Sequence, residues 1–528
     1  MSGRRVLALY ALLVGCFAAV VCRLYWLCSH ADYAARAAAQ SVVTLALPAR
    51  RDNFYDCEGH LLTGFGTKWM ALCVPGGGNY TRLFSCTDAA GQALYQKRNA
   101  VSPFLLTVNR DVSPLGISCW PVAVRYAAAP LAVQLIGYVD GDGRGAAGLE
   151  AAFDAALSGT GEGDTLTCLV NAQGRLRSEP EQTHADSGAV GVQLTLSRPV
   201  QRAAEAVAGR MMTTGCIVVL DAANAEVRAC VSVPGYDPAD PAASLNAADS
   251  PMLNRAFQSY AVGSVFKPVL AAAALEAGET GLVYTCPGWC EVDGQVFRCA
   301  GGIPHGEVDL AAALEKSCNG YFIRLGQVLG AERVRALAER VGFGQAAELT
   351  DRFRTAAGIL PTAEALTSSG AYANFCFGQG ELLATPVQVA GMLNALVTGT
   401  WRMPLFLRNT LDEATGEPLE TLAHRRAEPV VSEQTAQTLR GLLAGVVANG
   451  TGREAALPET TAAGKTGTAQ TGQFRAGEEL KNSWFAGVFP AEQPRYTIVV
   501  LQDAQTEPAH SSAAVFAALA EMLENLAR

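Results

Sequence analysis

The stretch Gly263-Ser264-Val265-Phe266-Lys267 decides how this chain is interpreted, because it begins an alanine-rich helical run that ends before Gly278. Side chains at positions i and i+3 share one face of a helix, so the Ser264 hydroxyl and the Lys267 amine are expected to point the same way. A hydroxyl becomes a good nucleophile when a base takes its proton. Burial can lower the pKa of a lysine from about 10.4 toward 7, which would make Lys267 that base. Taken alone, a Ser-x-x-Lys pair could equally be an exposed surface pair.

The chain contains only six lysines against 34 arginines, so each lysine is informative. A guanidinium stays charged and cannot act as a base in proteins. A sequence that prefers arginine this strongly places lysine where a permanently charged group would not serve. This argument singles out Lys267 and Lys465 as functional candidates.

A second polar element, Ser317-Cys318-Asn319, lies within a stretch predicted to be helical over residues 314–325. A hydroxyl and an amide two positions apart can line one wall of a cleft. Ser317 could relay a proton between the nucleophile and the leaving group, and Asn319 could bind a peptide carbonyl of a substrate. In isolation, both would be ordinary surface residues.

A third element, residues 464–469 (Gly-Lys-Thr-Gly-Thr-Ala), combines a lysine with two hydroxyls and two glycines. Lys465, Thr466 and Thr468 could bind a carboxylate, and the Thr468 N–H could complete an oxyanion hole. Gly467 would let a substrate backbone approach the edge of a strand closely. The element is therefore a candidate for substrate binding.

The three elements occur in the order that marks penicillin-interacting serine enzymes. A phosphate-binding loop would need a glycine where this chain has Glu459, so nucleotide binding is not predicted. The chain resembles the class B penicillin-binding proteins over nearly its whole length, also at residues 51–59, 136–138, 145–150, 236–238, 254–256, 378–380 and 385–386. It departs from the family pattern at Asp52, where glycine is common, and at Ala261-Val262. These departures concern the N-terminal part more than the chemistry.

The resemblance implies an α+β fold with an extended N-terminal pedestal and a transpeptidase domain. That domain would hold a five-stranded antiparallel sheet packed between helices, with an all-helical subdomain. The implied function is a peptidoglycan D,D-transpeptidase that cross-links stem peptides ending in D-Ala-D-Ala, without cofactor or metal, and is a target of β-lactam antibiotics. The compact pedestal and the cysteines around residues 286–299 favour the division or sporulation branch over elongation. A membrane glycosyltransferase of the shape, elongation, division and sporulation family is the implied partner.

The resemblance also implies a role for each site residue. Ser264 would attack as the nucleophile, with Lys267 as its base. Ser317 would shuttle the proton, and Asn319 would orient the donor peptide. The carboxylate of the donor would be bound by Lys465, Thr466, Gly467 and Thr468.

The first residues are expected to anchor the chain in the plasma membrane by a single helix over residues 6–28, which is apolar and long enough to span a bilayer. Arg4 and Arg5 favour a cytoplasmic tail, residues 1–5, and an extracytoplasmic catalytic part. A cleaved signal peptide, or a lipoprotein signal at residues 13–16, is the alternative. The length of the apolar run favours a retained anchor.

The remainder of the chain is long enough for two units, a pedestal over residues 29–205 and a transpeptidase domain over residues 206–528. A hairpin is predicted from residues 215–220 and 227–233. Two late strands, residues 483–489 and 496–501, precede a C-terminal helix. Strands at both ends with helices between them predict a sheet that is assembled from distant segments.

The net charge and the cysteines bear on two further functions, nucleic-acid binding and metal binding. A net charge of −9 without any basic run argues against nucleic-acid binding. Cys286, Cys290 and Cys299 cluster near His305, but their spacing matches no zinc pattern. A disulfide between two of these cysteines is therefore predicted in preference to a metal site.

Two other functions stay open. A D,D-carboxypeptidase or a β-lactamase would use the same three elements, but rapid hydrolysis needs a further base, and no convincing Glu-x-x-x-Asn element lies between Asn319 and Lys465. A non-catalytic β-lactam sensor or scaffold would need a cytoplasmic output domain, which five residues cannot supply. The transpeptidase is the favoured prediction.

Overall fold

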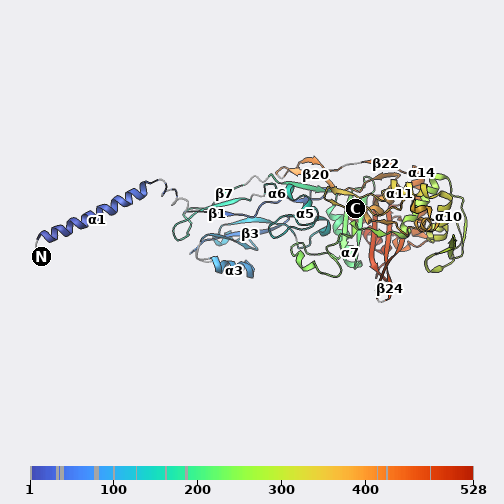
Figure 1. The fold of residues 1–528 in the computed structure, drawn as a ribbon, viewed down its shortest axis with the longest axis horizontal. Helices are drawn as coiled ribbons and strands as arrows, with labels where there is room; N and C mark the ends of the chain where they lie inside the picture. Colours follow the sequence, from blue (N-terminus) through green and yellow to red (C-terminus); the bar gives the residue numbers. More distant parts are fainter. Residues whose placement is uncertain are drawn as a thin grey trace. The chain divides into compact units, whose positions relative to one another are not determined.

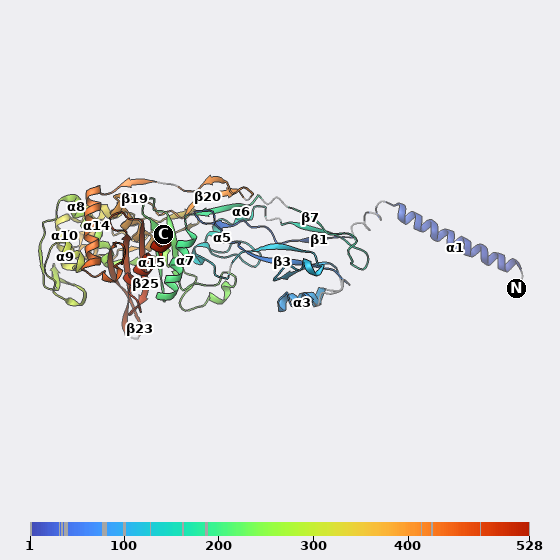
Figure 2. The same cartoon turned by 180° about the vertical axis from the view of Figure 1, so that it is seen from behind.

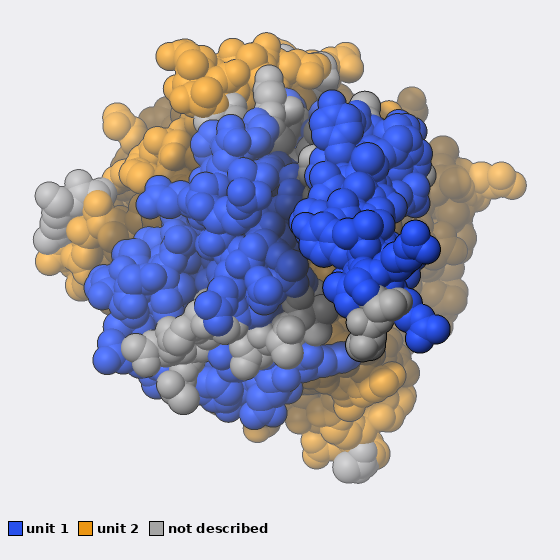
Figure 3. All heavy atoms as spheres, turned by 90° about the vertical axis from the view of Figure 1, so that its left-hand side faces the viewer, with its two compact units in different colours: residues 1–51, 64–125, 158–188 blue, residues 52–63, 126–157, 189–528 orange. Residues whose placement is uncertain are grey.

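The structure of the protein is a computed structural model. The structure describes residues 3–30, 32, 35, 41–75, 82–98, 102–126, 128–160, 163–184, 188–412, 414–423, 426–475 and 477–526. The chain divides into two compact units, drawn in blue and orange in Figure 3. The smaller unit comprises residues 1–51, 64–125 and 158–188, and the larger comprises residues 52–63, 126–157 and 189–528.

The predicted pedestal, residues 29–205, is divided between these units. Its blocks 52–63 and 126–157 pack within the larger unit together with residues 189–528. The boundary at residue 205 therefore stays a prediction about domain organisation.

The smaller unit begins with helix α1 (Gly3–Ser29), which is labelled in Figure 1. This helix has no buried residues and is long and apolar enough to cross a membrane. The predicted tail, residues 1–5, is described only from residue 3 onward.

Among its described residues, the rest of the smaller unit contains two three-stranded antiparallel sheets, a helix and a short 3-10 helix (Ser113–Leu115). One sheet has the order β1 (Val42–Ala46), β6 (Thr165–Leu169) and β7 (Glu181–Thr183), and the other has the order β4 (Phe104–Val108), β3 (Gly66–Cys73) and β5 (Cys119–Val124). Helix α3 (Ala89–Arg98) lies against β4. Phe104 and Leu106 belong to the small apolar core of this part.

The larger unit is built around a five-stranded antiparallel sheet. Its strand order is β10 (Val227–Val233), β9 (Gly215–Asp221), β25 (Tyr496–Gln505), β24 (Glu478–Phe489) and β23 (Ala463–Arg475). The predicted hairpin and the two late strands are confirmed, although both late strands are longer than predicted. Segments from the middle and the end of the chain thus meet in one sheet, with β23 at its edge.

Both faces of this sheet are buried, which explains the continuous apolar sequence of β9. Successive strand residues point to opposite faces. Ile217 and Val219 pack with helices α7 (Arg198–Met211) and α15 (Ser512–Leu526). Cys216, Val218 and Leu220 face the larger apolar core on the other side. Figure 2 shows α7 and α15 on one side of β23 and β25, and α8, α9, α10 and α14 on the other.

The helices that cover the second face carry two residues of the candidate site, Lys267 and Asn319, whereas residues 465–468 lie on β23. These helices are α8 (Lys267–Ala277), α9 (Leu310–Glu315), α10 (Asn319–Leu329), α11 (Ala331–Arg340), α12 (Ser369–Cys376), α13 (Pro386–Thr398) and α14 (Glu433–Ala448). Three antiparallel two-stranded pairs lie among them: β12 (Tyr284–Cys286) with β15 (Gly306–Val308), β13 (Trp289–Val292) with β14 (Gln295–Arg298), and β16 (Glu348–Thr350) with β17 (Phe353–Arg354).

Shorter elements complete the larger unit. The remaining strands are β2 (Phe54–Tyr55), β8 (Val190–Leu194), β11 (Tyr260–Ala261), β18 (Leu383–Ala384), β19 (Thr400–Arg402), β20 (Leu407–Asp412), β21 (Pro418–Thr421) and β22 (Ala427–Pro429). The short helices α4 (Val133–Ile136) and α5 (Gly148–Ala152) belong to the block 126–157, and α6 (Asp154–Ser158) follows directly.

Candidate active site

Ser264 lies in a short 3-10 turn, Gly263–Phe266, that leads into α8. Its side chain is partly exposed and lines a cleft of about 1300 Å³. Gly263 adopts φ +59, and a Cβ at this position would lie 2.7 Å from the carbonyl oxygen of Thr468. Glycine is therefore required here, because the turn that carries Ser264 packs directly on strand β23. Among the described residues, the Ser264 hydroxyl makes no hydrogen bond.

Lys267 is the first residue of α8, and its side chain is completely buried. The amine Nζ lies 2.8 Å from the backbone oxygen of Ser317, 3.1 Å from Ser317 Oγ and 2.8 Å from Asn319 Oδ1. Burial lowers the pKa of Lys267 to about 7. A large part of the amine population is therefore neutral near pH 7, which is the form that can accept a proton.

Ser317 does not lie within a continuous helix, so the prediction of one helix over residues 314–325 is wrong. Helix α9 ends before Ser317, which adopts φ +54, and α10 begins at Asn319. The N–H of Cys318 donates to the Ala313 carbonyl at 2.9 Å, and the N–H of Ser317 donates to Leu314 at 3.2 Å.

These two hydrogen bonds form a Schellman motif in which Ser317 occupies the left-handed position that glycine usually takes. Sequence reasoning missed this break because no glycine marks it. A left-handed serine costs roughly 1–2 kcal/mol in backbone energy. The strained turn aims the Ser317 hydroxyl at two buried lysines, and strain of this kind clusters at functional sites.

Lys465 on β23 is also completely buried. Its amine lies 3.0 Å from Ser317 Oγ and 3.1 Å from the carbonyl oxygen of Thr466. Burial lowers the pKa of Lys465 well below its usual value, and the charge of Lys267 lowers it further. The Lys465 amine lies behind the cleft wall, whereas the hydroxyl residues Thr466 and Thr468 line the cleft.

Gly467 also lines the cleft, but the structure gives a different physical reason for a glycine from the one expected. A Cβ at this position would lie 2.9 Å from Val265 Cγ1 and 3.1 Å from the carbonyl oxygen of Val262. The missing side chain makes room for the turn that carries Ser264. Gly467 thus lets β23 approach the nucleophile turn of its own chain.

The structure therefore brings all eight predicted site residues together. Six of them line the cleft: Ser264, Ser317, Asn319, Thr466, Gly467 and Thr468. The other two, Lys267 and Lys465, lie directly behind the wall and contact Ser317.

Several cleft residues were not predicted. They include Asn374, Gln379, Thr451, Lys481 and Trp484. Gln379 lies in the stretch 378–380, which resembles the family pattern, but the sequence alone does not indicate a role for it. Thr451 has a specific contact, since its Oγ1 lies 2.7 Å from Thr466 Oγ1.

The disulfide predicted among Cys286, Cys290 and Cys299 is not formed. All three cysteines are free, and the sulfur atoms of Cys286 and Cys299 are 3.7 Å apart, far longer than the ~2.05 Å of a disulfide bond. His305 and Cys318 join Cys286 and Cys299 in one cluster of possible ligand atoms, whereas Cys290 lies outside it.

The five-stranded sheet and the cleft with Ser264 and two buried lysines are typical of penicillin-interacting serine enzymes, and comparison with known protein families confirms this class. Residues 215–521 match the family described as the penicillin binding protein transpeptidase domain. The chain belongs to this family.

Two similar proteins indicate which group of penicillin-binding proteins the chain resembles. The chain is 30% identical over 386 residues to the stage V sporulation protein D of Bacillus subtilis, covering 70% of this chain and 58% of that protein. It is 31% identical over 417 residues to the penicillin-binding protein PbpB of Mycolicibacterium smegmatis, covering 74% of this chain and 62% of that protein. These relatives are class B penicillin-binding proteins, as the sequence elements predicted. The matched region spans only about 60% of their length.

Solved structures agree with this assignment. Penicillin binding protein 3 of Mycobacterium tuberculosis in complex with ampicillin has a TM-score of 0.68 at 26% identity, covering 92% of this chain and 96% of that chain. A chain from a peptidoglycan synthase complex that coordinates polymerization and crosslinking has a TM-score of 0.70 at 25% identity, covering 98% of this chain and 97% of that chain. The expected α+β transpeptidase fold is confirmed.

Proposed function

We propose that this protein is a serine D,D-transpeptidase that cross-links peptidoglycan stem peptides through an acyl-enzyme on Ser264. One observation carries the proposal. The buried Lys267 amine, with a pKa lowered to about 7, contacts Ser317 and Asn319 at the wall of the cleft on which Ser264 lies. A nucleophile, a base and a hydroxyl that can relay a proton thus share one site.

The proposed acylation step uses these groups in sequence. The neutral Lys267 amine accepts the Ser264 proton as Oγ attacks the carbonyl carbon of the penultimate D-alanine. The peptide bond to the terminal D-alanine breaks, and the leaving nitrogen receives a proton through Ser317. The N–H groups of Ser264 and Thr468 would stabilise the developing oxyanion.

In the proposed deacylation step, a proton moves from the acceptor amine back to Ser264 Oγ. An amine of a second stem peptide attacks the ester carbonyl, its proton passes to Lys267 and returns to Ser264 Oγ, and the new peptide bond is the cross-link. The alternative acceptor is water, which would make the enzyme a carboxypeptidase or a β-lactamase.

Binding of the donor carboxylate is proposed for Thr466 and Thr468, with Lys465 behind them. The hydroxyl of Thr466 lies 3.4 Å from the Lys465 amine, and Thr468 is exposed to the cleft. Protonation of Lys465 when a carboxylate arrives would supply the positive charge. Asn319, whose Nδ2 donates to the Arg298 carbonyl at 2.9 Å, is fixed in a position to orient the donor peptide.

The proposed setting is the outer face of the plasma membrane. Helix α1 would serve as a single-pass anchor with Arg4 and Arg5 on the cytoplasmic side. Residues 29–205 would serve as the pedestal and residues 206–528 as the transpeptidase domain. A membrane glycosyltransferase of the shape, elongation, division and sporulation family would be the partner, because a structural relative comes from a complex that couples polymerization to crosslinking. The proposed role is in division or sporulation, and the name of the stage V sporulation protein D of Bacillus subtilis supports sporulation.

Labelling with a fluorescent penicillin tests the nucleophile. The full-length chain in detergent should form a stable covalent adduct that peptide mapping places on Ser264, and Ser264→Ala should abolish it. Ser113→Ala, at an exposed position of the smaller unit, serves as the control and should label normally. Labelling of Ser264→Ala at the wild-type level would refute the assignment.

A product assay then separates the two acceptors. Incubation with a pentapeptide donor and an amine acceptor should give mostly cross-linked peptide. Release of free tetrapeptide as the main product would identify a hydrolase instead.

A further inference from the structure

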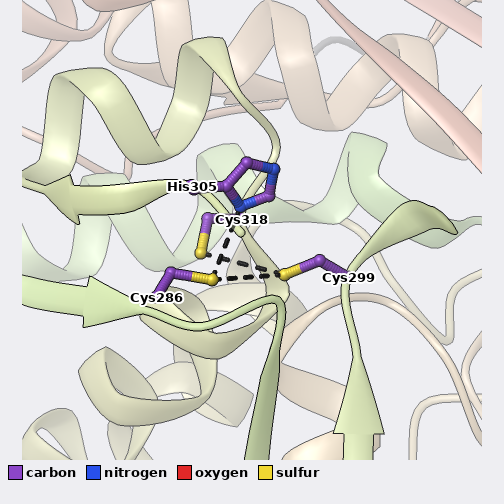
Figure 4. Close-up of side chains that lie close together, drawn as sticks. All are labelled: Cys286, Cys299, His305 and Cys318. Carbon is purple, nitrogen blue, oxygen red and sulfur yellow. Dashed lines mark hydrogen bonds between the residues drawn. The ribbon is translucent and has the colours of Figure 1, made fainter. Parts of the chain in front are cut away.

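Three thiols and an imidazole converge in the larger unit (Figure 4). One of the thiols belongs to Cys318, which directly follows Ser317 in the chain. Cys286 ends β12, Cys299 follows β14, His305 precedes β15 and Cys318 is the N-cap of α10. The three cysteines are buried, with at most 3% of each exposed, and His305 is half-buried. Four different segments thus direct soft donor atoms toward one point.

The spacing of these donor atoms fits a tetrahedral metal ion. The sulfur atoms of Cys286 and Cys299 are 3.7 Å apart, and those of Cys299 and Cys318 are 4.0 Å apart. His305 Nδ1 lies 3.6 Å from the sulfur of Cys286, and all four donor atoms lie within 4.8 Å of one another. Zinc–sulfur bonds of about 2.3 Å at tetrahedral angles place two sulfur atoms roughly 3.8 Å apart.

Backbone groups around the cluster favour thiolates. The N–H of Gly288 points at the sulfur of Cys286 at 3.4 Å, and the N–H of Tyr321 points at the sulfur of Cys318 at 3.5 Å. Such N–H donors stabilise negative sulfur, which is the form that binds a metal. A single disulfide would use only two of the three thiols and would leave the third beside the imidazole.

We propose that Cys286, Cys299, His305 and Cys318 form a closed, four-coordinate site for a zinc-class divalent cation. Three thiolates and one neutral imidazole are a ligand set of structural zinc sites, which leave no open position for substrate. Binding would release protons from the thiols and would exchange no electrons. The ion is therefore a structural element and takes no part in the acyl transfer.

The position of Cys318 would connect the metal site to the turn that carries Ser317. Cys318 lies between Ser317 and Asn319, both of which contact the Lys267 amine. A metal bound to Cys318 would fix the left-handed turn at Ser317 from behind. We regard the four ligands as positioning residues for the Ser317 turn, a consequence that rests on the proposed function, whereas metal binding itself does not.

Metal analysis of the full-length chain, purified in detergent without chelator and under reducing conditions, tests the site. About one zinc ion per chain is expected for the wild type, and less than about a tenth of that for Cys299→Ser. Cys290→Ser is the matched control, because Cys290 is equally buried in the neighbouring β13 and lies outside the cluster. His305→Ala provides a second variant at a less buried ligand in case Cys299→Ser fails to fold.

Cobalt provides the spectroscopic test. Exchange of the metal for Co²⁺ should give thiolate-to-cobalt charge-transfer absorption and tetrahedral d–d bands in the wild type and in Cys290→Ser, but not in Cys299→Ser. Absence of bound metal and of these bands in the wild type would overturn the proposal. A disulfide between two of the three thiols, detected by mass spectrometry of chain that was alkylated at lysis and purified without reductant, would also overturn it.

The two proposals fail in different ways. If the metal is present but fluorescent penicillin does not label Ser264, the site stands and the transpeptidase proposal falls. If Ser264 labels normally and no metal binds, only the metal site falls. In a protein with both, Cys299→Ser should lower the labelling rate at least about tenfold while Ser264→Ala retains its zinc.

Discussion

Lys267 and Lys465, which come from different halves of the transpeptidase family match, share one hydroxyl oxygen. Their amines lie 3.1 and 3.0 Å from Ser317 Oγ, and both side chains are fully buried. Two positive charges this close in a buried site repel each other strongly, so at least one amine must be neutral. The arrangement therefore keeps a base in its neutral form and lets Ser317 exchange a proton with either lysine.

The acylation rate should rise with pH through about 7. Because burial lowers the pKa of Lys267 to about 7, the neutral amine increases from about a tenth at pH 6 to about nine tenths at pH 8. The second-order rate constant for a fluorescent penicillin should therefore rise roughly tenfold over this range and then level off. Stopped-flow or quench measurement at constant ionic strength tests this expectation. A rate that continues to rise through pH 9 would mean that the base has an ordinary lysine pKa.

Lys267→Arg should reduce acylation by about 10²–10⁴-fold, because a guanidinium cannot accept the Ser264 proton. The same replacement at the exposed Lys97 of α3 is the control and should leave the labelling rate unchanged. Circular dichroism of both variants checks that the fold is retained. Wild-type labelling of folded Lys267→Arg would remove Lys267 from the role of base.

Gly467→Ala should impair both stability and acylation. The added methyl group would overlap Val265 Cγ1 and push β23 away from the nucleophile turn. Overpacking of this kind costs about 1–3 kcal/mol, and the displaced Thr468 should lower the acylation rate as well. Gly441→Ala in α14 is a matched control, since a Cβ there meets no atom within 4 Å. That control should raise the unfolding free energy by up to about 1 kcal/mol, as measured by denaturant titration.

Glu226→Ala should destabilise the larger unit without touching the cleft. The completely buried Glu226 carboxylate contacts two arginines, with Arg228 Nη1 at 3.0 Å and Arg408 Nε at 3.1 Å. Removal of a buried ion-pair partner costs about 3–5 kcal/mol. Arg408 would lose its contact with Glu226, whereas Arg228 would keep its ion pair with Asp221 at 3.0 Å.

An exposed ion pair provides the comparison for Glu226. Glu348 lies 3.8 Å from Arg354, and both side chains are more than half exposed, so Glu348→Ala should cost less than about 1 kcal/mol. If both variants lost the same unfolding free energy, the buried ion pairs of Glu226 would contribute no more to stability than the exposed pair of Glu348.

Much of the fold could be predicted from local sequence patterns. The apolar runs of β9 and β10, the C-cap at Gly278 and the C-terminal helix α15 are local signals, and all are confirmed. The break between α9 and α10 could not be predicted, because it depends on a left-handed serine that no local rule favours. Tertiary contacts of Ser317 with two buried lysines offset the strain of that turn.

The candidate site, like the fold, could be predicted only in part from the sequence. Sequence order and residue type selected Ser264, Lys267, Ser317, Asn319 and residues 465–468. The placement of Lys465 behind the cleft wall and the role of Gly467 as a contact to Val265 depend on how β23 packs against the nucleophile turn. Neither could be predicted, because both concern contacts between residues far apart in the chain, with 148 positions between Lys465 and Ser317 and more between Gly467 and Val265.

The sequence by itself determined which groups can do the chemistry, since a hydroxyl, an amine that is able to lose its proton and a glycine-flanked strand are properties of residue type and local spacing. Only the tertiary structure decided that two buried amines meet at one hydroxyl, and that Cys318 rather than Cys290 joins Cys286, Cys299 and His305. The physical reason is that burial and the direction of a side chain depend on the packing of distant segments. Packing also lowers the pKa of Lys267, which no local pattern could specify.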